Sequence, residues 1–189
     1  MSGLVGVDSL YLADEQAALL LALVAAGSAG EEGEVPVGAV LRDPAGRFLG
    51  ECGNRCIASS DPTGHAELRL LRQAAARIGN YRLPGAVLAV TLAPCPICMA
   101  ALAAARVARV AYEVDSPLAA AGPEGRGDLP VLAQPLASGM DSSIEIEYSD
   151  QYVVSSVPSQ DGGKMGDAGA LLRIFFAQRR KICSNEPFR

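Results

Sequence analysis

Four residues in this chain have the types and the spacing of a metal site with an acid beside it. His65, the single histidine, is followed two residues later by Glu67, and Cys95 and Cys98 stand three residues apart further along the chain. Cysteines at this spacing share one face of a helix, and the positive end of a helix dipole favours the thiolate that binds metal. One imidazole and two thiolates suit zinc, and three protein ligands leave a position for water. We therefore expect His65, Cys95 and Cys98 to bind Zn²⁺.

Glu67 has the position of an acid that serves this metal without binding it. It lies two residues after His65 at the start of a predicted helix, so its side chain can point into the same cavity. There it can take a proton from a metal-bound water and deliver it to a substrate. We expect Glu67 to be the catalytic residue.

Each half of the pattern also has an ordinary explanation. A histidine near a glutamate is usually a polar pair, and a CxxC can be a redox motif, half of a zinc knuckle or two core cysteines. A second pair, Cys52 and Cys56, could join the CxxC pair in a structural site of four thiolates. That arrangement would leave the histidine and the glutamate without a purpose. Cys183 is interpreted as a plain thiol.

The surrounding sequence predicts the elements that must hold these residues. Their order is helix, hairpin, helix, strand, helix, strand, which implies a sheet covered by helices, with right-handed crossovers between parallel strands. The predicted helices cover residues 8–26, 67–78 and 96–106, a loop covers 27–33, and the predicted strands cover 37–41, 48–51, 86–92 and 107–114.

The chain changes character after residue 115. Residues 116–143 are rich in Pro, Gly, Ala and Ser, with a candidate short helix at 129–133, and a strand is predicted at 144–148. A polar, Gly-rich surface loop is expected at 155–169. The last predicted helix, 170–182, carries a group of basic residues beside two phenylalanines.

Composition limits the function classes. With 50% hydrophobic and 20% charged residues, the chain is neither wholly disordered, nor collagen-like, nor a disulfide-dense miniprotein. Its net charge of -5 requires any nucleic-acid contact to be a local basic patch. The apolar run at 19–26 lacks a preceding Lys or Arg, and two prolines interrupt the run at 86–105. We expect no export signal, no membrane span and a cytoplasmic protein.

Joined, the two halves match the H-x-E…P-C-x-x-C arrangement of zinc deaminases. The chain resembles the bacterial tRNA-specific adenosine deaminases, within the cytidine deaminase-like superfamily, over residues 31–114 and again at 175–180. The stretches that carry the resemblance are Glu34-Val35-Pro36-Val37-Gly38-Ala39-Val40, Gly53-Asn54-Arg55, Asp61-Pro62-Thr63-Gly64-His65-Ala66-Glu67, Asn80-Tyr81-Arg82-Leu83, Thr91-Leu92-Ala93-Pro94-Cys95 and Phe175-Phe176-Ala177-Gln178-Arg179-Arg180.

The resemblance implies a fold, an activity and partners. The fold is α/β, a three-layer cytidine deaminase-like fold with a mixed central sheet of about five strands and helices on both faces. Residues 1–189 would form a single zinc-dependent deaminase domain with a surface insertion at about 151–166. The implied enzyme is a zinc-dependent hydrolase that converts adenosine to inosine at the wobble position of a tRNA anticodon stem-loop, acting as a homodimer.

The resemblance also implies roles for single residues. His65, Cys95 and Cys98 bind zinc and Glu67 transfers the proton. Asn54 hydrogen-bonds a base flipped out of the RNA loop, which Pro36, Val37, Ala66 and Pro94 surround, and Phe176, Arg179 and Arg180 approach the anticodon stem-loop. An exposed loop base is splayed out cheaply, and arginines suit phosphates.

Three departures from the family, one of them the insertion at about 151–166, and two other functions stand beside this interpretation. Ala93 replaces a Glu that is usual before Pro-Cys, and Arg126 is the only basic residue in the segment 116–127, where the family has a Lys- and Gly-rich loop. A deaminase of a free nucleobase such as guanine or cytosine would suit the acidic net charge. A non-catalytic partner subunit would be expected to lack the acid that this chain has at Glu67.

Overall fold

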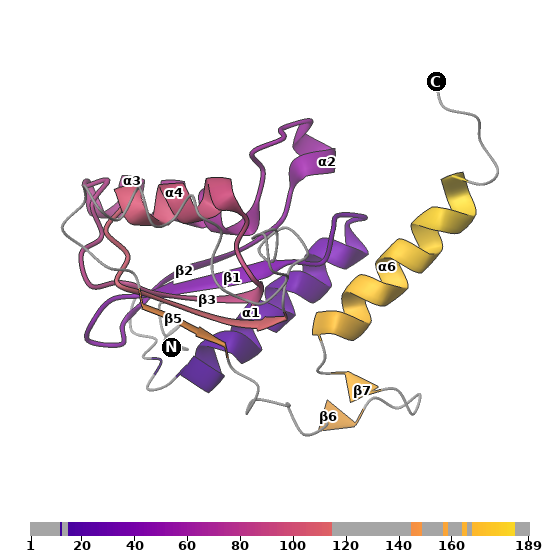
Figure 1. Cartoon of the computed structure of the whole chain (residues 1–189), viewed down its shortest axis with the longest axis horizontal. Coiled ribbons are helices and arrows are strands. Elements are labelled where there is room, and N and C mark those ends of the chain that lie inside the picture. Colours follow the sequence, from indigo (N-terminus) through magenta and orange to yellow (C-terminus); the bar gives the residue numbers. More distant parts are fainter. Residues whose placement is uncertain are drawn as a thin grey trace, which may run out of the picture.

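A computed structural model of the chain describes Leu12 and residues 15–114, 145–148, 157–158, 164–165 and 168–183 (Figure 1). The described helices are α1 Glu15–Glu31, α2 Cys56–Ser59, α3 Ala66–Ile78, α4 Pro96–Ala104 and α6 Ala168–Cys183. The described strands are β1 Gly38–Arg42, β2 Phe48–Gly53, β3 Val87–Leu92, β4 Arg109–Val114, β5 Glu145–Tyr148, β6 Val157–Pro158 and β7 Lys164–Met165.

The central sheet is mixed, as predicted. Its strands lie in the order β2-β1-β3-β4-β5. β1 is antiparallel to both β2 and β3, whereas β3 and β4, and β4 and β5, are parallel. The predicted hairpin is confirmed at β1 and β2, and β6 and β7 form a separate antiparallel pair.

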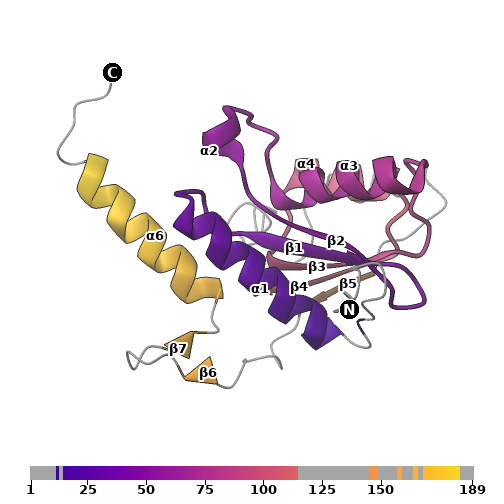
Figure 2. The ribbon, with the colours of Figure 1, turned by 180° about the vertical axis from the view of Figure 1, so that it is seen from behind.

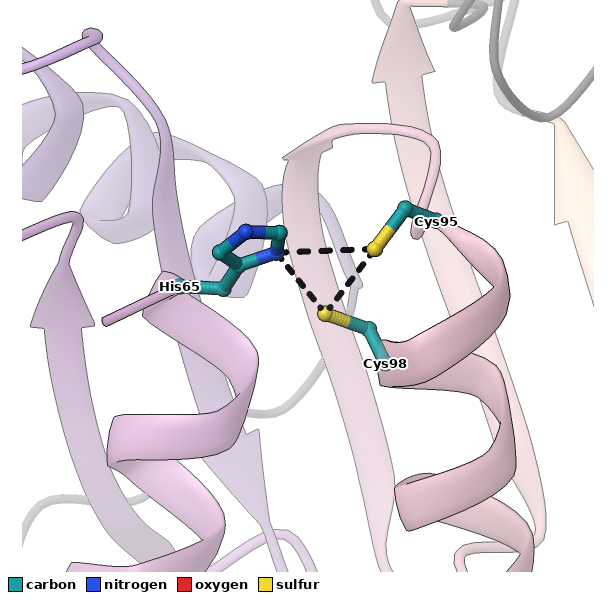
Figure 3. Close-up of side chains that lie close together, drawn as sticks. All are labelled: His65, Cys95 and Cys98. Carbon is teal, nitrogen blue, oxygen red and sulfur yellow. Dashed lines mark hydrogen bonds between the residues drawn. The ribbon is translucent and has the colours of Figure 1, made fainter. Parts of the chain in front are cut away.

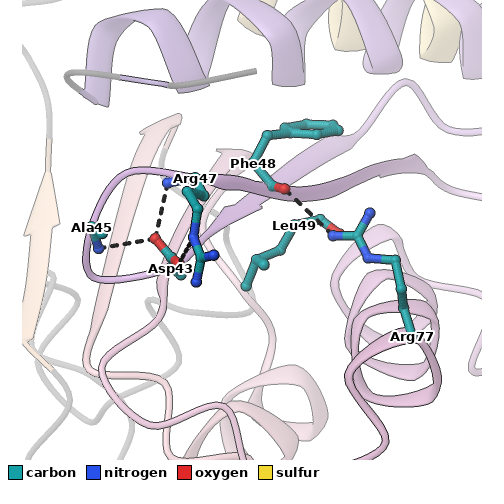
Figure 4. Close-up of polar contacts among 6 residues, drawn as sticks. All are labelled: Asp43, Ala45, Arg47, Phe48, Leu49 and Arg77. Carbon is teal, nitrogen blue, oxygen red and sulfur yellow. Dashed lines mark hydrogen bonds and ion pairs between the residues drawn. The ribbon is translucent and has the colours of Figure 1, made fainter. Parts of the chain in front are cut away.

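The turn between β1 and β2 is organised by one acid. One oxygen of Asp43, Oδ1, accepts hydrogen bonds from the backbone N–H groups of Ala45 and Arg47, both at 2.9 Å. The other oxygen lies 2.6 Å from Nε of Arg47, and nearby Arg77 of α3 donates to backbone oxygens of β2 (Figure 4). A short aspartate turn of this kind is readable from sequence because the partners are local.

Helices cover both faces of the sheet. Figures 1 and 2 show α3 and α4 on one face and α1 on the other, with α6 beside α1. Alternate residues of β1 point to the two layers, as the strand period requires. Ala39 and Leu41 join the core under α3 and α4, whereas Val40 joins the core under α1. The predicted α/β arrangement is confirmed.

Several expected elements are corrected. The surface loop predicted at 155–169 contains β6 and β7, and α6 begins at Ala168 rather than at residue 170. α1 continues to Glu31, so the predicted loop at 27–33 is wrong over its first five residues. The reason is packing: the helix presents only small side chains to the sheet there, including Ala26 and Ala29, and this contact outweighs the poor helix propensity of glycine. The four-residue helix α2 was not predicted, and β4 begins at Arg109 rather than at residue 107.

One further expectation is confirmed, and others concern residues that the structure does not describe. The predicted stop of α3 at Gly79 is confirmed, since that residue adopts a φ of 72° and its N–H bonds the carbonyl of Ala75. The candidate helix at 129–133, the segment 116–127 with Arg126, and the start of the predicted helix at 8–14 lie outside the described residues, apart from Leu12. Within the described part of the chain, no helix has both the length and the apolar character needed to cross a membrane.

Gly38 allows α1 to lie directly on β1. A Cβ atom at this position would stand 2.0 Å from the carbonyl oxygen of Ala22 and 2.5 Å from the backbone nitrogen of Ala26. Backbone atoms of a packed helix cannot move aside as a flexible side chain can. Gly27, on the same helix, has no atom within 4 Å of the equivalent position.

We therefore expect Gly38→Ala to lower the free energy of unfolding, by at least about 1–3 kcal/mol, because the added methyl overpacks the contact between α1 and β1. Gly27→Ala is the matched control and should raise stability by about 0.5–1 kcal/mol, since alanine is favoured inside a helix. Denaturant unfolding of both variants measures the difference. Equal stability of the two variants would contradict this account of the helix–sheet contact.

Candidate metal and base-binding site

The three predicted metal ligands lie together where two helices begin. His65 precedes α3, Cys95 precedes α4, and Cys98 lies in the first turn of α4. Nδ1 of His65 is 3.3 Å from Sγ of Cys98 and 3.5 Å from Sγ of Cys95, and the two sulfur atoms are 3.5 Å apart (Figure 3). In the described part of the chain, these three residues form the group whose ligand atoms could hold a metal ion.

The donor set and its dimensions fit zinc. Four tetrahedral ligands at about 2.0–2.3 Å from zinc stand about 3.3–3.8 Å apart, which agrees with the separations of the nitrogen and the two sulfurs. A neutral imidazole and two thiolates are ligands that zinc prefers. With three protein ligands, the fourth position belongs to water or substrate, as in catalytic rather than structural sites.

The two cysteine thiols influence each other through a shared hydrogen bond. The hydrogen bond shared with the sulfur of Cys98 lowers the pKa of the Cys95 thiol to about 5. The same bond, together with burial, raises the pKa of Cys98. Zinc binds cysteine as the thiolate, so its binding at this place would release thiol protons.

Glu67 is buried beside these ligands. It lies in the first turn of α3 with 4% of its surface exposed. Burial raises the pKa of its carboxyl group, and Cys95 raises it further, while His65 acts in the opposite direction. A raised pKa favours the protonated form of a carboxyl group, which a general acid needs when it donates its proton.

Asn54 is fixed at the edge of the same site by two hydrogen bonds. Its Oδ1 accepts from the backbone N–H of Ala66, at 2.9 Å, and its own backbone N–H donates to the carbonyl of Val37, at 2.9 Å. Only the amide oxygen can accept from an N–H group, so the Nδ2 amine faces away from Ala66. Asn54 therefore presents a donor at a defined place next to the metal group.

The other four residues predicted to surround the base are buried. Pro36 and Val37 precede β1, Ala66 begins α3, and Pro94 precedes Cys95. All four are buried. Through its two hydrogen bonds, Asn54 connects Val37 to Ala66, the residue that follows His65.

Ala93 is also buried, at 6% exposure, and its backbone N–H donates to the carbonyl of Val114. Its methyl group belongs to the core under α3 and α4. This position therefore faces inward.

The second cysteine pair takes no part in the metal group of the described residues. Cys52 is buried in β2 and Cys56 lies in α2, both as free thiols. Their sulfur atoms are not among the ligand atoms of His65, Cys95 and Cys98 that lie within 4.8 Å of one another. The structure thus contradicts the four-thiolate alternative. The side chain of Cys183 lies outside the described residues.

The predicted RNA-binding helix is α6. Phe176 is 47% exposed, and the guanidinium group of Arg179 lies 5.5 Å from the ring centre of Phe175. Nη2 of Arg179 also donates to the carbonyl of Gly33, at 3.4 Å, which ties α6 to the turn before Pro36. The side chain of Arg180 is outside the described part of the chain.

Two buried polar residues near the site had no role in the sequence interpretation. Glu34 is fully buried and its carboxylate binds the backbone of α2, while Oγ1 of Thr91 accepts from the N–H of Gly38, at 3.1 Å. A polar residue inside the apolar run 86–92 is a signal for Thr91. The partners of Glu34 are more than twenty residues away, which no local pattern reveals.

Comparison with known proteins gives one family and several close relatives. Residues 12–114 match the family described as the cytidine and deoxycytidylate deaminase zinc-binding region. The chain is 50% identical over 97 residues to a tRNA-specific adenosine deaminase of Agrobacterium fabrum, a match that covers 51% of this chain and 63% of that protein. It is 31% identical over 175 residues to a tRNA-specific adenosine deaminase of Bacillus subtilis, covering 92% of this chain and 91% of that protein.

One solved structure is similar in both sequence and fold. It comes from a study of A-to-I editing by tRNA:A34 deaminases at the wobble position of transfer RNA, and it is 37% identical with a TM-score of 0.59, covering 69% of this chain and 90% of that chain. The chain spans less than two thirds of the length of the first curated relatives it matches, between 16% and 63%.

The metal group predicts how zinc binding responds to single cysteine changes. The protein should bind one zinc ion per chain, and Cys98→Ser should abolish this binding because a ligand of the three is weakened. Cys56→Ser is the matched control and should retain the metal, since its thiol lies outside the group. Metal analysis after dialysis against a weak chelator measures both. Loss of zinc in the control alone would instead support a site built on the second cysteine pair.

Proposed function

The chain belongs to the cytidine and deoxycytidylate deaminase family, and on that premise we propose that it converts adenosine to inosine at the wobble position of a tRNA anticodon. The observation that carries the proposal is the association of the His65, Cys95 and Cys98 group with a buried acid and a fixed amide donor. The tRNA-specific relatives, at up to 50% identity, support adenosine in RNA as the substrate.

The proposed reaction is a hydrolysis. Water adds to C6 of the adenine ring, the C6–N bond breaks, and ammonia leaves as a C6–O bond replaces it. His65, Cys95 and Cys98 would hold zinc, which would supply an activated water at neutral pH. Glu67 would take one proton from that water and give it to N1 of the ring, and would then pass the second proton, from the added hydroxyl, to the amine that leaves as ammonia. Its burial beside the ligands suits this role.

Asn54 and four buried residues would bind the base. The Nδ2 amine of Asn54 donates a hydrogen bond to the flipped base, while Pro36, Val37, Ala66 and Pro94 surround it. Because the oxygen of Asn54 is already bound to the backbone of Ala66, the amide is held in one orientation before the base arrives. A preoriented donor lowers the ordering entropy that base binding must overcome.

The remaining parts of the proposal concern the RNA and the assembly. Phe176, Arg179 and Arg180 of α6 contact the anticodon stem-loop, and α6 is tied to the turn before Pro36 by Arg179. We also propose a homodimer, and a single zinc-dependent deaminase domain over residues 1–189 with a sheet of about five strands and an insertion at about 151–166. We propose, finally, that the protein is cytoplasmic.

An inosine assay tests the function directly. Zinc-loaded protein should form inosine in an anticodon stem-loop with adenosine at the wobble position, and release no ammonia from free adenosine, guanine or cytosine. Glu67→Gln should retain zinc and lose turnover by about 10²–10⁴-fold, because the water loses its proton acceptor. Ammonia from a free base alone would replace RNA editing by the small-molecule function. Normal turnover by zinc-loaded Glu67→Gln would overturn the assigned role of Glu67.

The RNA contact of α6 makes a separate prediction. Arg179→Ala combined with Arg180→Ala should weaken stem-loop binding and reduce the salt dependence of log K by about one unit of slope per lost phosphate contact. The zinc content should not change. Arg82→Ala is the control, because this exposed arginine stacks on Tyr81 beyond the end of α3. Filter binding across a salt series gives the slopes, and identical slopes for both variants would exclude α6 as the RNA contact.

A further inference from the structure

We propose that Glu34 is a positioning residue that holds Asn54 in its base-binding orientation by anchoring α2, an inference that rests on the proposed function. Glu34 has no exposed surface, although a carboxylate is among the groups least often buried. Its place in the chain is two residues before Pro36 and twenty residues before Asn54. Glu34 is therefore close in sequence to Pro36, on one side of the proposed base pocket, while its carboxylate contacts the helix that follows Asn54.

The carboxylate binds the backbone of α2 with both oxygens. Oε2 accepts from the N–H of Ile57 at 3.1 Å, and Oε1 accepts from the N–H of Ala58 at 2.7 Å. Hydrogen bonds with one charged partner are shorter and stronger than neutral ones, and the second distance is in that range. Because both oxygens are occupied and the residue is fully buried, Glu34 is not placed to exchange protons with a substrate.

α2 has no hydrophobic contact of its own with the core. The helix has four residues and buries none of its side chains, so it contributes nothing to the hydrophobic core. Its N-cap residue, Arg55, makes no side-chain capping bond. The N–H groups that a helix start leaves unsatisfied are here bound by Glu34, from the opposite side of the pocket.

The anchored segment leads directly into Asn54. Arg55, between Asn54 and α2, is fixed on its other side by the bond from its N–H to the carbonyl of Gly64, at 2.8 Å. A Cβ on Gly64 would stand 2.9 Å from Arg55 backbone atoms, so the chain segments at Arg55 and Gly64 are in close contact. A displacement of α2 is therefore transmitted to Asn54 rather than absorbed by a flexible connection.

Glu34 is itself held firmly. Its backbone N–H donates to the carbonyl of Ala29 in α1, at 2.9 Å. The neighbouring residue Gly33 accepts the bond from Arg179. The carboxylate thus connects a rigid part of the fold, at the end of α1, to a short helix that has no core of its own.

Removal of this carboxylate should lower activity through Asn54. We expect Glu34→Ala to reduce kcat/KM on the wobble-adenosine stem-loop by about 10–100-fold, since a small misplacement of a positioning group has effects of this size. In an Asn54→Ala background the same change should reduce kcat/KM less than about 3-fold, because the residue it positions is already gone. Equal losses in both backgrounds would show a general structural role and overturn the proposal.

Two further variants keep the test decisive. Glu34→Gln retains one acceptor oxygen and should recover part of the activity, and it serves as the main variant if Glu34→Ala does not fold. Glu31→Ala removes an exposed acid from the same region and should leave kcat/KM and zinc content unchanged. Zinc content should also be unchanged in both Glu34 variants.

Hydrogen exchange separates this inference from the proposed function. In either Glu34 variant the amides of Ile57 and Ala58 should exchange at least 10-fold faster, while those of β3 keep their protection. Unchanged protection at these two amides would refute the anchoring role, whatever the substrate. Failure of the wild-type protein to edit RNA, with faster exchange in the variants, would instead refute only the tRNA function.

Discussion

The site depends on two helices that begin side by side at one edge of the sheet. His65 precedes α3 and Cys95 precedes α4, so the metal geometry is set by how these helices pack. Leu70 of α3 and Leu102 of α4 are fully buried in the same core over the sheet. Bonds from zinc to nitrogen and sulfur vary little in length, so a relative shift of the two helices by an ångström would disrupt the set. Hydrophobic packing far from the metal therefore determines whether the ligands can meet.

The metal group was readable from sequence because its signals are local and chemical. The spacing of Cys95 and Cys98 implies one helix face, and a single histidine leaves no choice of imidazole. The β1–β2 hairpin and the end of α3 were readable for the same reason, since Asp43 and Gly79 act on neighbours within four residues. These parts of the fold follow from short-range preferences that the sequence states directly.

The missed features depend on partners distant in the sequence. α1 runs past Gly27 because small residues let it lie on β1, where Gly38 accepts the close approach. The sequence of α2 shows neither a strong helix propensity nor a hydrophobic pattern that would predict a helix, and none of its side chains is buried. Its anchor, Glu34, looks like one acid among several in the segment 31–34 until its bonds to residues 57 and 58 are seen. Tertiary contacts decide such cases, and a local reading has no access to them.

The lack of buried side chains in α2 has a consequence for how this protein can change. Substitutions in a core alter stability, and most of them are lost during evolution for that reason. The side chains of α2 are not under that constraint, because none of them is buried. Glu34 binds the backbone N–H groups of residues 57 and 58, and every amino acid except proline supplies such a group. This stretch, next to the proposed base pocket, can thus vary its outward side chains while its backbone path stays fixed, so new substrate preferences could arise there with little loss of stability.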